Sequence, residues 1–174
     1  MGAERFYGFL DRDIVGKTKS NESLPGDVAL SKSKTFRMII AKMAEHFGVE
    51  VKSAGLNLYK DGRDYVPFHH DTLGRVHDDD GYMTIGASFG CERSLDFLHI
   101  GEVEYHRKQS MDNRTGHHLK PMKQRFSLPQ RNGDVFAFSA KMNRLFRHSV
   151  PRVYDKKCGP RFSVMLWGKR KDVI

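Results

Sequence analysis

The chain lacks features that define several common protein classes. It holds 2 cysteines in 174 residues, Cys91 and Cys158, and neither belongs to a C-x-x-C pair. A disulfide framework and a thiolate zinc site are therefore not expected, and we interpret both cysteines as reduced thiols. No apolar run approaches the roughly 20 residues that span a bilayer, and the first residues form no apolar signal core. We expect a soluble intracellular protein of the cytoplasm or nucleus that makes no membrane contact.

Acidic residues are too few to balance the basic ones. The chain has 30 Lys and Arg against 21 Asp and Glu, which gives a net charge of +9 at pH 7. This balance favours a polyanionic partner, and nucleic acid is the commonest one. The stretch 105–131 combines Lys, Arg and aromatic residues that can follow a phosphate backbone. A basic surface that serves only solubility, with an exposed basic loop at 105–131, is the simpler alternative.

Internal repeats and low-complexity tracts are also absent, so length and hydrophobic periodicity indicate the architecture. A hydrophobic content of 39% over 174 residues predicts one domain with an ordered core. The segment 35–48 repeats apolar residues at helical spacing and ends in a glycine. These apolar residues are Phe36, Ile39 or Ile40, Met43 and Phe47, followed by Gly48.

About eight short apolar runs follow this helix, separated by turn sequences such as "KDGRD" at 60–64 and "RNGD" at 131–134. The pattern predicts a mainly β protein with flanking helices, built as a barrel or a double-sheet jelly roll. We expect residues 1–53 to form an N-terminal helical and extended support region. Residues 54–174 would then form the core of what is one domain overall, and we expect a monomer.

The segment "PFHHD", residues 67–71, carries the first candidate ligands for a metal. Residues two apart on an extended strand share a face, so His69 and Asp71 point one way and His70 the other. A third ligand must come from another strand, and His148 in "LFRHSVPR" is the best candidate. Two histidines and a carboxylate that leave open positions are typical of non-haem Fe(II) oxygenases. A rival pair in "HDDD", His77 with Asp79, fits a solvated acidic turn better.

A second set of residues can bind a carboxylate-bearing cosubstrate. Arg161 and Ser163, in "GPRFSVML", share a strand face and offer a guanidinium and a hydroxyl. This is what the distal carboxylate of 2-oxoglutarate requires. Asn57 and Tyr59, in "LNLY", are also two apart and offer an amide and a phenol to the same ligand.

With these motifs in this order, the chain resembles the AlkB-like Fe(II)/2-oxoglutarate dioxygenases from about Ala54 to Arg170. The resemblance is carried by "LNLYKDGRDYVPFHHD", "IGASFGCERSLDF", "NGDVFAFSAKMNRLFRHSVPR" and "GPRFSVMLWGKR". It implies a double-stranded β-helix that uses Fe(II), 2-oxoglutarate and O2 to demethylate a base in DNA or RNA. The implied iron ligands are His69, Asp71 and His148. The implied residues of the 2-oxoglutarate site are Asn57, Tyr59 and Arg161, with Ser163 beside them.

Two departures from the family pattern concern the substrate side of the site. Many members carry a second arginine six residues after the first, where this chain has Trp167, and Arg170 lies an odd number of residues further on. Repair members often carry an acid two residues after the ligand aspartate, where this chain has Leu73. With Arg93, these residues are our candidates for contacts on the substrate side. The alternatives are the same chemistry on a protein side chain, or a non-catalytic nucleic-acid-binding module of this fold.

Overall fold

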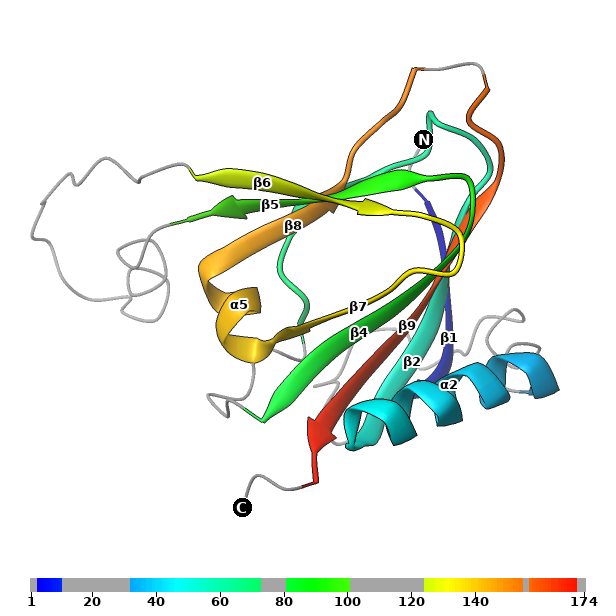
Figure 1. Ribbon diagram of the computed structural model, residues 1–174, viewed down its shortest axis with the longest axis vertical. Coiled ribbons are helices and arrows are strands. Elements are labelled where there is room, and N and C mark those ends of the chain that lie inside the picture. The colour runs from blue at the N-terminus through cyan, green and yellow to red at the C-terminus, as the bar shows by residue number, and fades with distance from the viewer. Residues whose placement is uncertain (1–2, 11–31, 73–80, 101–123, 155–156, 172–174) are drawn as a thin grey trace, which may run out of the picture.

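The computed structural model describes residues 3–10, 32–72, 81–100, 124–154 and 157–171 (Figure 1). Within these residues the chain forms two antiparallel sheets. The larger sheet has the order β1 (Glu4–Leu10), β2 (Val49–Tyr59), β9 (Arg161–Arg170), β4 (Tyr82–Gly90) and β7 (Val135–Ser139). The smaller sheet has the order β3 (Val66–His69), β8 (Phe146–Val150), β5 (Arg93–His99) and β6 (Arg125–Gln130). The described helices are α2 (Lys34–Phe47) and α5 (Ala140–Leu145).

Successive strands from β2 to β9 cross repeatedly between the two sheets, and the last strand, β9, lies between β2 and β4. This arrangement is a double-stranded β-helix, so the predicted jelly-roll core is confirmed. Because β9 is paired on both edges, its side chains reach the middle of the larger sheet. Alternate residues of β9 therefore face the space between the sheets, and the intervening ones face α2.

Helix α2 covers the outer face of the larger sheet (Figure 1). The Ser33 hydroxyl accepts a hydrogen bond from the Phe36 N–H at its start, and Gly48 ends it with φ +61°. Phe36, Ile40 and Met43 are buried against strand residues, as the periodicity predicted. The boundary predicted after residue 53 falls inside β2, so α2 and the core strands pack as one unit.

Most of the apolar runs became strands, but two elements were not predicted. Strand β1 extends the larger sheet by pairing with β2, and its segment gave no clear alternation. Helix α5 ends with Arg144 and Leu145, immediately before β8 begins at Phe146, and the sequence did not predict it. The Ser139 hydroxyl caps α5 by accepting a hydrogen bond from the Met142 N–H.

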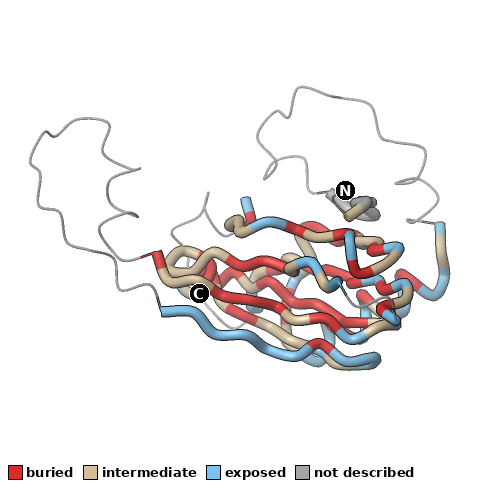
Figure 2. Tube along the Cα trace, turned by 90° about the horizontal axis from the view of Figure 1, so that it is seen from above, coloured by how far each residue is buried: buried red, intermediate tan, exposed pale blue. Residues whose placement is uncertain are grey.

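Burial follows the two-layer design, with buried residues running along the strands (Figure 2). A second apolar cluster between the sheets contains Tyr59, Phe97 and Phe138.

The two cysteines are free, and their Sγ atoms lie 3.0 Å apart. Neither described helix has the length and hydropathy needed to cross a membrane.

Two glycines with positive φ, Gly90 at the end of β4 and Gly133 in the turn between β6 and β7, provide a matched test of this packing. Gly90 and Gly133 have φ of +96° and +89°, but a Cβ at Gly90 would lie 2.4 Å from the Pro160 carbonyl oxygen, whereas one at Gly133 meets nothing within 4 Å. We predict that Gly133→Ala lowers the free energy of unfolding by about 1–2 kcal/mol through backbone strain. Gly90→Ala should lower it further, because the backbone must also move. Urea unfolding of both variants measures the difference, and equal losses would contradict the packing at Gly90.

Candidate metal centre

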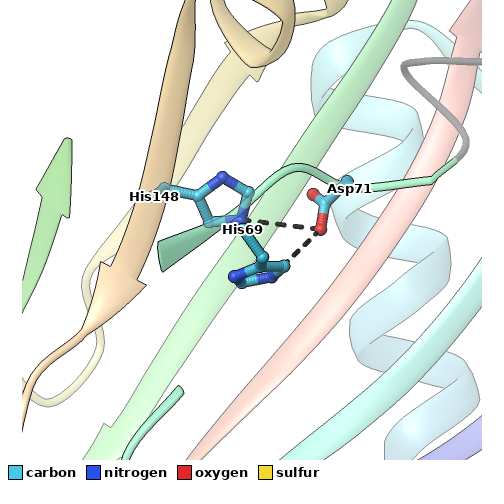
Figure 3. Close-up of side chains that lie close together, drawn as sticks. All are labelled: His69, Asp71 and His148. Carbon is cyan, nitrogen blue, oxygen red and sulfur yellow. Dashed lines mark ion pairs between the residues drawn. The ribbon is translucent and has the colours of Figure 1, made fainter. Parts of the chain in front are cut away.

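Three side chains that bind metals in other proteins converge between the sheets (Figure 3). His69 ends β3 and is paired directly with His148 on β8, while Asp71 follows β3 by two residues. The Nε2 atoms of His69 and His148 lie 3.6 and 3.5 Å from Asp71 Oδ1. The ligand atoms of the set all lie within 4.8 Å of one another. Two imidazole nitrogens and one carboxylate oxygen thus face a common point.

The backbone near β3 fixes the orientation of these rings. His69 Nδ1 lies 2.9 Å from the Pro67 carbonyl oxygen, which leaves Nε2 facing Asp71. His70 points the other way, as the alternation predicted, and its Nδ1 meets the Asn143 carbonyl oxygen. His148 Nδ1 is buried without a hydrogen-bond partner among the described residues. The rings of His69 and His148 lie 4.3 Å apart between centroids.

Asp71 is held by residues from three other elements. Its Oδ2 accepts hydrogen bonds from Thr84 Oγ1 on β4, at 2.8 Å, and from Trp167 Nε1 on β9, at 3.0 Å. Asn143 on α5 accepts from the Asp71 N–H and donates to the Asp71 carbonyl, both at 2.9 Å. The sequence did not point to Thr84 or Asn143, because both contacts with Asp71 depend on how distant segments pack, although Asn143 lies within one of the segments that carry the resemblance.

The charge state of Asp71 follows from opposing influences. Burial alone would raise the pKa of the Asp71 carboxyl, since it disfavours the charged form. The neighbouring His148 and His69 outweigh this effect of burial through electrostatic attraction and hydrogen bonding. They hold the pKa of Asp71 well below the ordinary value. The site therefore presents an anionic oxygen between two imidazoles, which suits a divalent cation.

Arg161 forms the second notable feature of the interior. It is only 1% exposed, and its guanidinium lies 5.0 Å from the centroid of the Tyr59 ring. Its Nη2 donates to Ser88 Oγ at 2.6 Å, but Nε and Nη1 are buried with no hydrogen-bond partner among the described residues. Burial lowers the pKa of Arg161, with Tyr59 opposing the shift, and a guanidinium stays charged at neutral pH. Two unused donors on a buried cation are suited to bind an anion.

The structure places some of the remaining predicted residues in this interior and others elsewhere. Asn57 and Tyr59 on β2 are direct neighbours of Ser163 and Arg161 on β9, so these four predicted cosubstrate residues share one face. Their role in binding 2-oxoglutarate stays a prediction. Arg93 is buried, and its guanidinium donates to the carbonyl oxygens of Asp61, Asp64 and Pro151.

The candidates for contacts on the substrate side lie in different environments. The Arg93 guanidinium is thus engaged by backbone carbonyl oxygens, and its role on the substrate side stays a prediction. Arg170 is exposed at the end of β9, off the face of Arg161. Trp167, one of the candidates for the substrate side, donates a hydrogen bond to Asp71 and packs on Tyr82 and Ala140. Leu73 and the rival pair His77 and Asp79 lie outside the described residues, as does most of the basic stretch 105–131.

Comparison with known proteins gives relatives that are distant in sequence. No protein-family model matches the chain. It is similar to uncharacterized protein R406 of Acanthamoeba polyphaga mimivirus, with 28% identity over 130 residues, or 75% of this chain. The chain spans 56% of the length of that relative.

Several solved structures are similar to the chain at low identity. An oxidoreductase of the 2OG-Fe(II) oxygenase family from Burkholderia pseudomallei matches with 14% identity over 98% of this chain and 68% of that one, at a TM-score of 0.47. OsALKBH1 matches with 15% identity over 87% and 71%, at 0.48. A prolyl-4-hydroxylase from Pseudomonas putida matches with 16% identity over 88% and 70%, at 0.41. The assignment of chemistry therefore depends on the residues of this chain.

The metal centre can be tested through its own ligands. We predict that His69→Ala, Asp71→Ala and His148→Ala each weaken Mn(II) binding by more than about a hundredfold, because changes to outer partners alone weaken metal binding about 10- to 100-fold. His70→Ala is the matched control, since its ring points to Asn143 and away from the other three. Free Mn(II), followed by electron paramagnetic resonance, gives each affinity. A loss in His70→Ala as large as that in His69→Ala would show that the faces are assigned wrongly.

Proposed function

We propose that the protein is an Fe(II)- and 2-oxoglutarate-dependent dioxygenase that oxidatively demethylates a base in DNA or RNA. One observation carries the proposal. The cluster of His69, Asp71 and His148 shares an interior with Arg161, a buried cation that has two unused donors. A metal site with open positions and a carboxylate-binding cation are the two parts that this chemistry needs.

The donor set favours iron over the alternatives. Two imidazoles and one carboxylate on one side of a point leave several positions open, which is the arrangement of non-haem Fe(II) oxygenases. Zinc hydrolases use similar ligands, with water in the remaining position. A zinc hydrolase gives no reason to bury an arginine with unused donors, whereas a dicarboxylate cosubstrate does. The buried arginine therefore favours an oxygenase over a hydrolase.

The spacing along β9 also suits 2-oxoglutarate. Arg161 and Trp167 are on the same face, and Trp167 touches Asp71. Six residues of extended strand span about 20 Å between these Cα atoms. That interval accommodates a guanidinium, a five-carbon dicarboxylate and a metal ion. Ser163 and Asn57 are neighbours across β9 and β2 and lie beside this interval.

The roles of the protein and of the bound groups are distinct. Iron with 2-oxoglutarate and O2 supplies the oxidation of a substrate C–H bond, with succinate and CO2 as the other products. His69, Asp71 and His148 would hold the metal, and Arg161 would orient the cosubstrate. Phe138 and Phe97 lie 5.1 and 6.1 Å from the His148 ring between centroids and form an apolar wall that excludes water.

The charge of the protein supports a nucleic-acid substrate. Trp167 packs on Ala140, so α5 and the end of β9 lie next to each other beside Asp71. Both elements carry basic residues, and these are Lys141, Arg144, Lys169 and Arg170. With a net charge of +9, such an edge favours phosphate groups. Oxidation of an N-methyl group on a base gives a hemiaminal, which releases formaldehyde.

A protein side chain is the second candidate substrate, and Leu73 favours it. An acid at this position would contact a cationic base in the repair enzymes that the sequence resembles, and leucine removes that contact. The same metal centre would then hydroxylate or demethylate an amino-acid side chain. The substrate classes differ in how salt affects binding, because phosphate contacts weaken steeply as salt rises.

A substrate screen decides between these classes. We predict that methylated oligonucleotides raise succinate production above the level seen with Fe(II), 2-oxoglutarate and O2 alone, and that they release formaldehyde. Oligonucleotide binding should weaken as salt increases. Stimulation by peptides and none by oligonucleotides would move the function to a protein substrate. A wild-type protein that binds neither Fe(II) nor Mn(II) would leave only a non-catalytic binding module.

The anion site gives a further prediction. Arg161→Lys keeps the charge but loses the planar pair of donors, so we expect 2-oxoglutarate to bind about 10- to 100-fold more weakly. Calorimetry on the Mn(II)-loaded protein, without O2, measures this affinity apart from turnover. Arg170→Ala is the control and should keep the wild-type affinity, because Arg170 is exposed and off the face of Arg161. A loss in Arg170→Ala alone would move the role to that arginine.

A further inference from the structure

We infer that Trp167 and Thr84 are positioning residues that hold the Asp71 carboxylate so that it offers one oxygen to the metal. The inference rests on the proposed metal centre and goes beyond it. It concerns Trp167, which stands where the family pattern has a second arginine, and Thr84, which belongs to no motif. The observation that carries it is the pair of hydrogen bonds to Asp71 Oδ2.

The sheet register brings these donors together. Thr84 on β4 and Trp167 on β9 are direct partners across antiparallel strands, so their side chains stand next to each other on the inner face. Thr84 is 3% exposed, and the indole packs on Tyr82 and Ala140. Both donors are therefore fixed by packing before any metal arrives. They approach the same oxygen at 2.8 and 3.0 Å.

The two carboxylate oxygens consequently have different roles. A carboxylate oxygen offers about two lone pairs, and the hydroxyl and the indole N–H occupy those of Oδ2. Oδ1 is the oxygen that faces His69 and His148, at 3.6 and 3.5 Å from their Nε2 atoms. Only Oδ1 is thus directed at the common point of the three ligands.

Asn143 fixes the rest of the aspartate. Its amide bonds both the N–H and the carbonyl of Asp71, which holds the backbone against α5. The carboxylate then moves only through its own side-chain torsions, and Trp167 and Thr84 restrain these. The three residues come from β4, β9 and α5, so the carboxylate is fixed from several directions.

Single-oxygen binding affects how many positions remain for ligands. A six-coordinate ion with three protein atoms keeps three open positions, enough for a chelating 2-oxo acid and O2. If both oxygens of Asp71 bound the metal, only two would remain. Trp167 and Thr84 would therefore keep open the position that O2 requires.

The chain offers well-matched variants for a test. Trp167→Phe keeps an aromatic ring and removes the N–H, while Thr84→Val keeps the shape and removes the hydroxyl. Thr84→Ser restores the hydroxyl and tests for rescue. Met165→Leu is the packing control, since Met165 is a buried apolar residue on the same face of β9. Trp167 is the only tryptophan, so its fluorescence also reports metal binding in the wild type and in the threonine variants.

The readout is Mn(II) binding, measured by electron paramagnetic resonance on the full chain, with metal-free thermal unfolding alongside. We expect Trp167→Phe and Thr84→Val to bind Mn(II) about tenfold or more weakly, as is usual for outer-shell partners. Thr84→Ser and Met165→Leu should stay within about twofold of the wild type. Water-proton relaxation should count three waters on Mn(II) bound to the wild type.

The outcomes separate this inference from the proposed metal centre. Wild-type affinity in both Trp167→Phe and Thr84→Val would overturn the positioning role while leaving the centre intact. A count of two waters on wild-type Mn(II) would overturn single-oxygen binding by Asp71. Failure of the wild type to bind Mn(II) would instead remove the metal centre itself. If Trp167→Phe does not fold, Thr84→Val against Thr84→Ser still decides the question.

Discussion

A buried carboxylate between two imidazoles is the interaction on which the rest of the interior depends. Burial of Asp71 is unfavourable for its charged form, yet the neighbouring His148 and His69 hold its pKa well below the ordinary value. Thr84, Trp167 and Asn143 then satisfy its remaining polar atoms from β4, β9 and α5. An unpaired buried charge would be strongly destabilising, so these elements are constrained to meet around this one residue.

The central place of β9 explains how one strand serves two parts of the site. Because β9 pairs with β2 and β4, its alternate residues project into the middle of the interior rather than at an edge. Arg161 at one end carries unused donors, and Trp167 near the other end bonds the aspartate. The period of two that places Arg161 and Ser163 on one face also places Trp167 there. The separation of Arg161 from the cluster around Asp71 is thus set by the rise of a single strand.

The local parts of this design were predictable from the sequence, and the long-range parts were not. The alternation of side chains along a strand sufficed to predict that His69 and Asp71 share a face and that His70 points the other way. The helical spacing of apolar residues predicted α2. The contacts of Asn143 and Thr84 with Asp71 bridge 72 and 13 residues of sequence. No periodicity reports such contacts, since they depend on the strand order and on the short helix α5, which the sequence did not predict. Trp167 was noticed as a departure from a family pattern, but its hydrogen bond required the register of β4 and β9.

In the proposed function, the chemistry and the choice of substrate depend on different parts of the molecule. The polar interior tolerates little change. Replacing Arg161, a metal ligand or a hydrogen-bond donor to Asp71 leaves a buried polar group without its partner. The basic residues on α5 and at the end of β9 are instead our candidates for contacts with the partner. Position 73 carries a leucine where the family pattern often has an acid, while the net charge is +9. Attraction to a nucleic acid would then act through its phosphates, and discrimination among bases would depend on the shape of the site beside Trp167 rather than on the charge of the base.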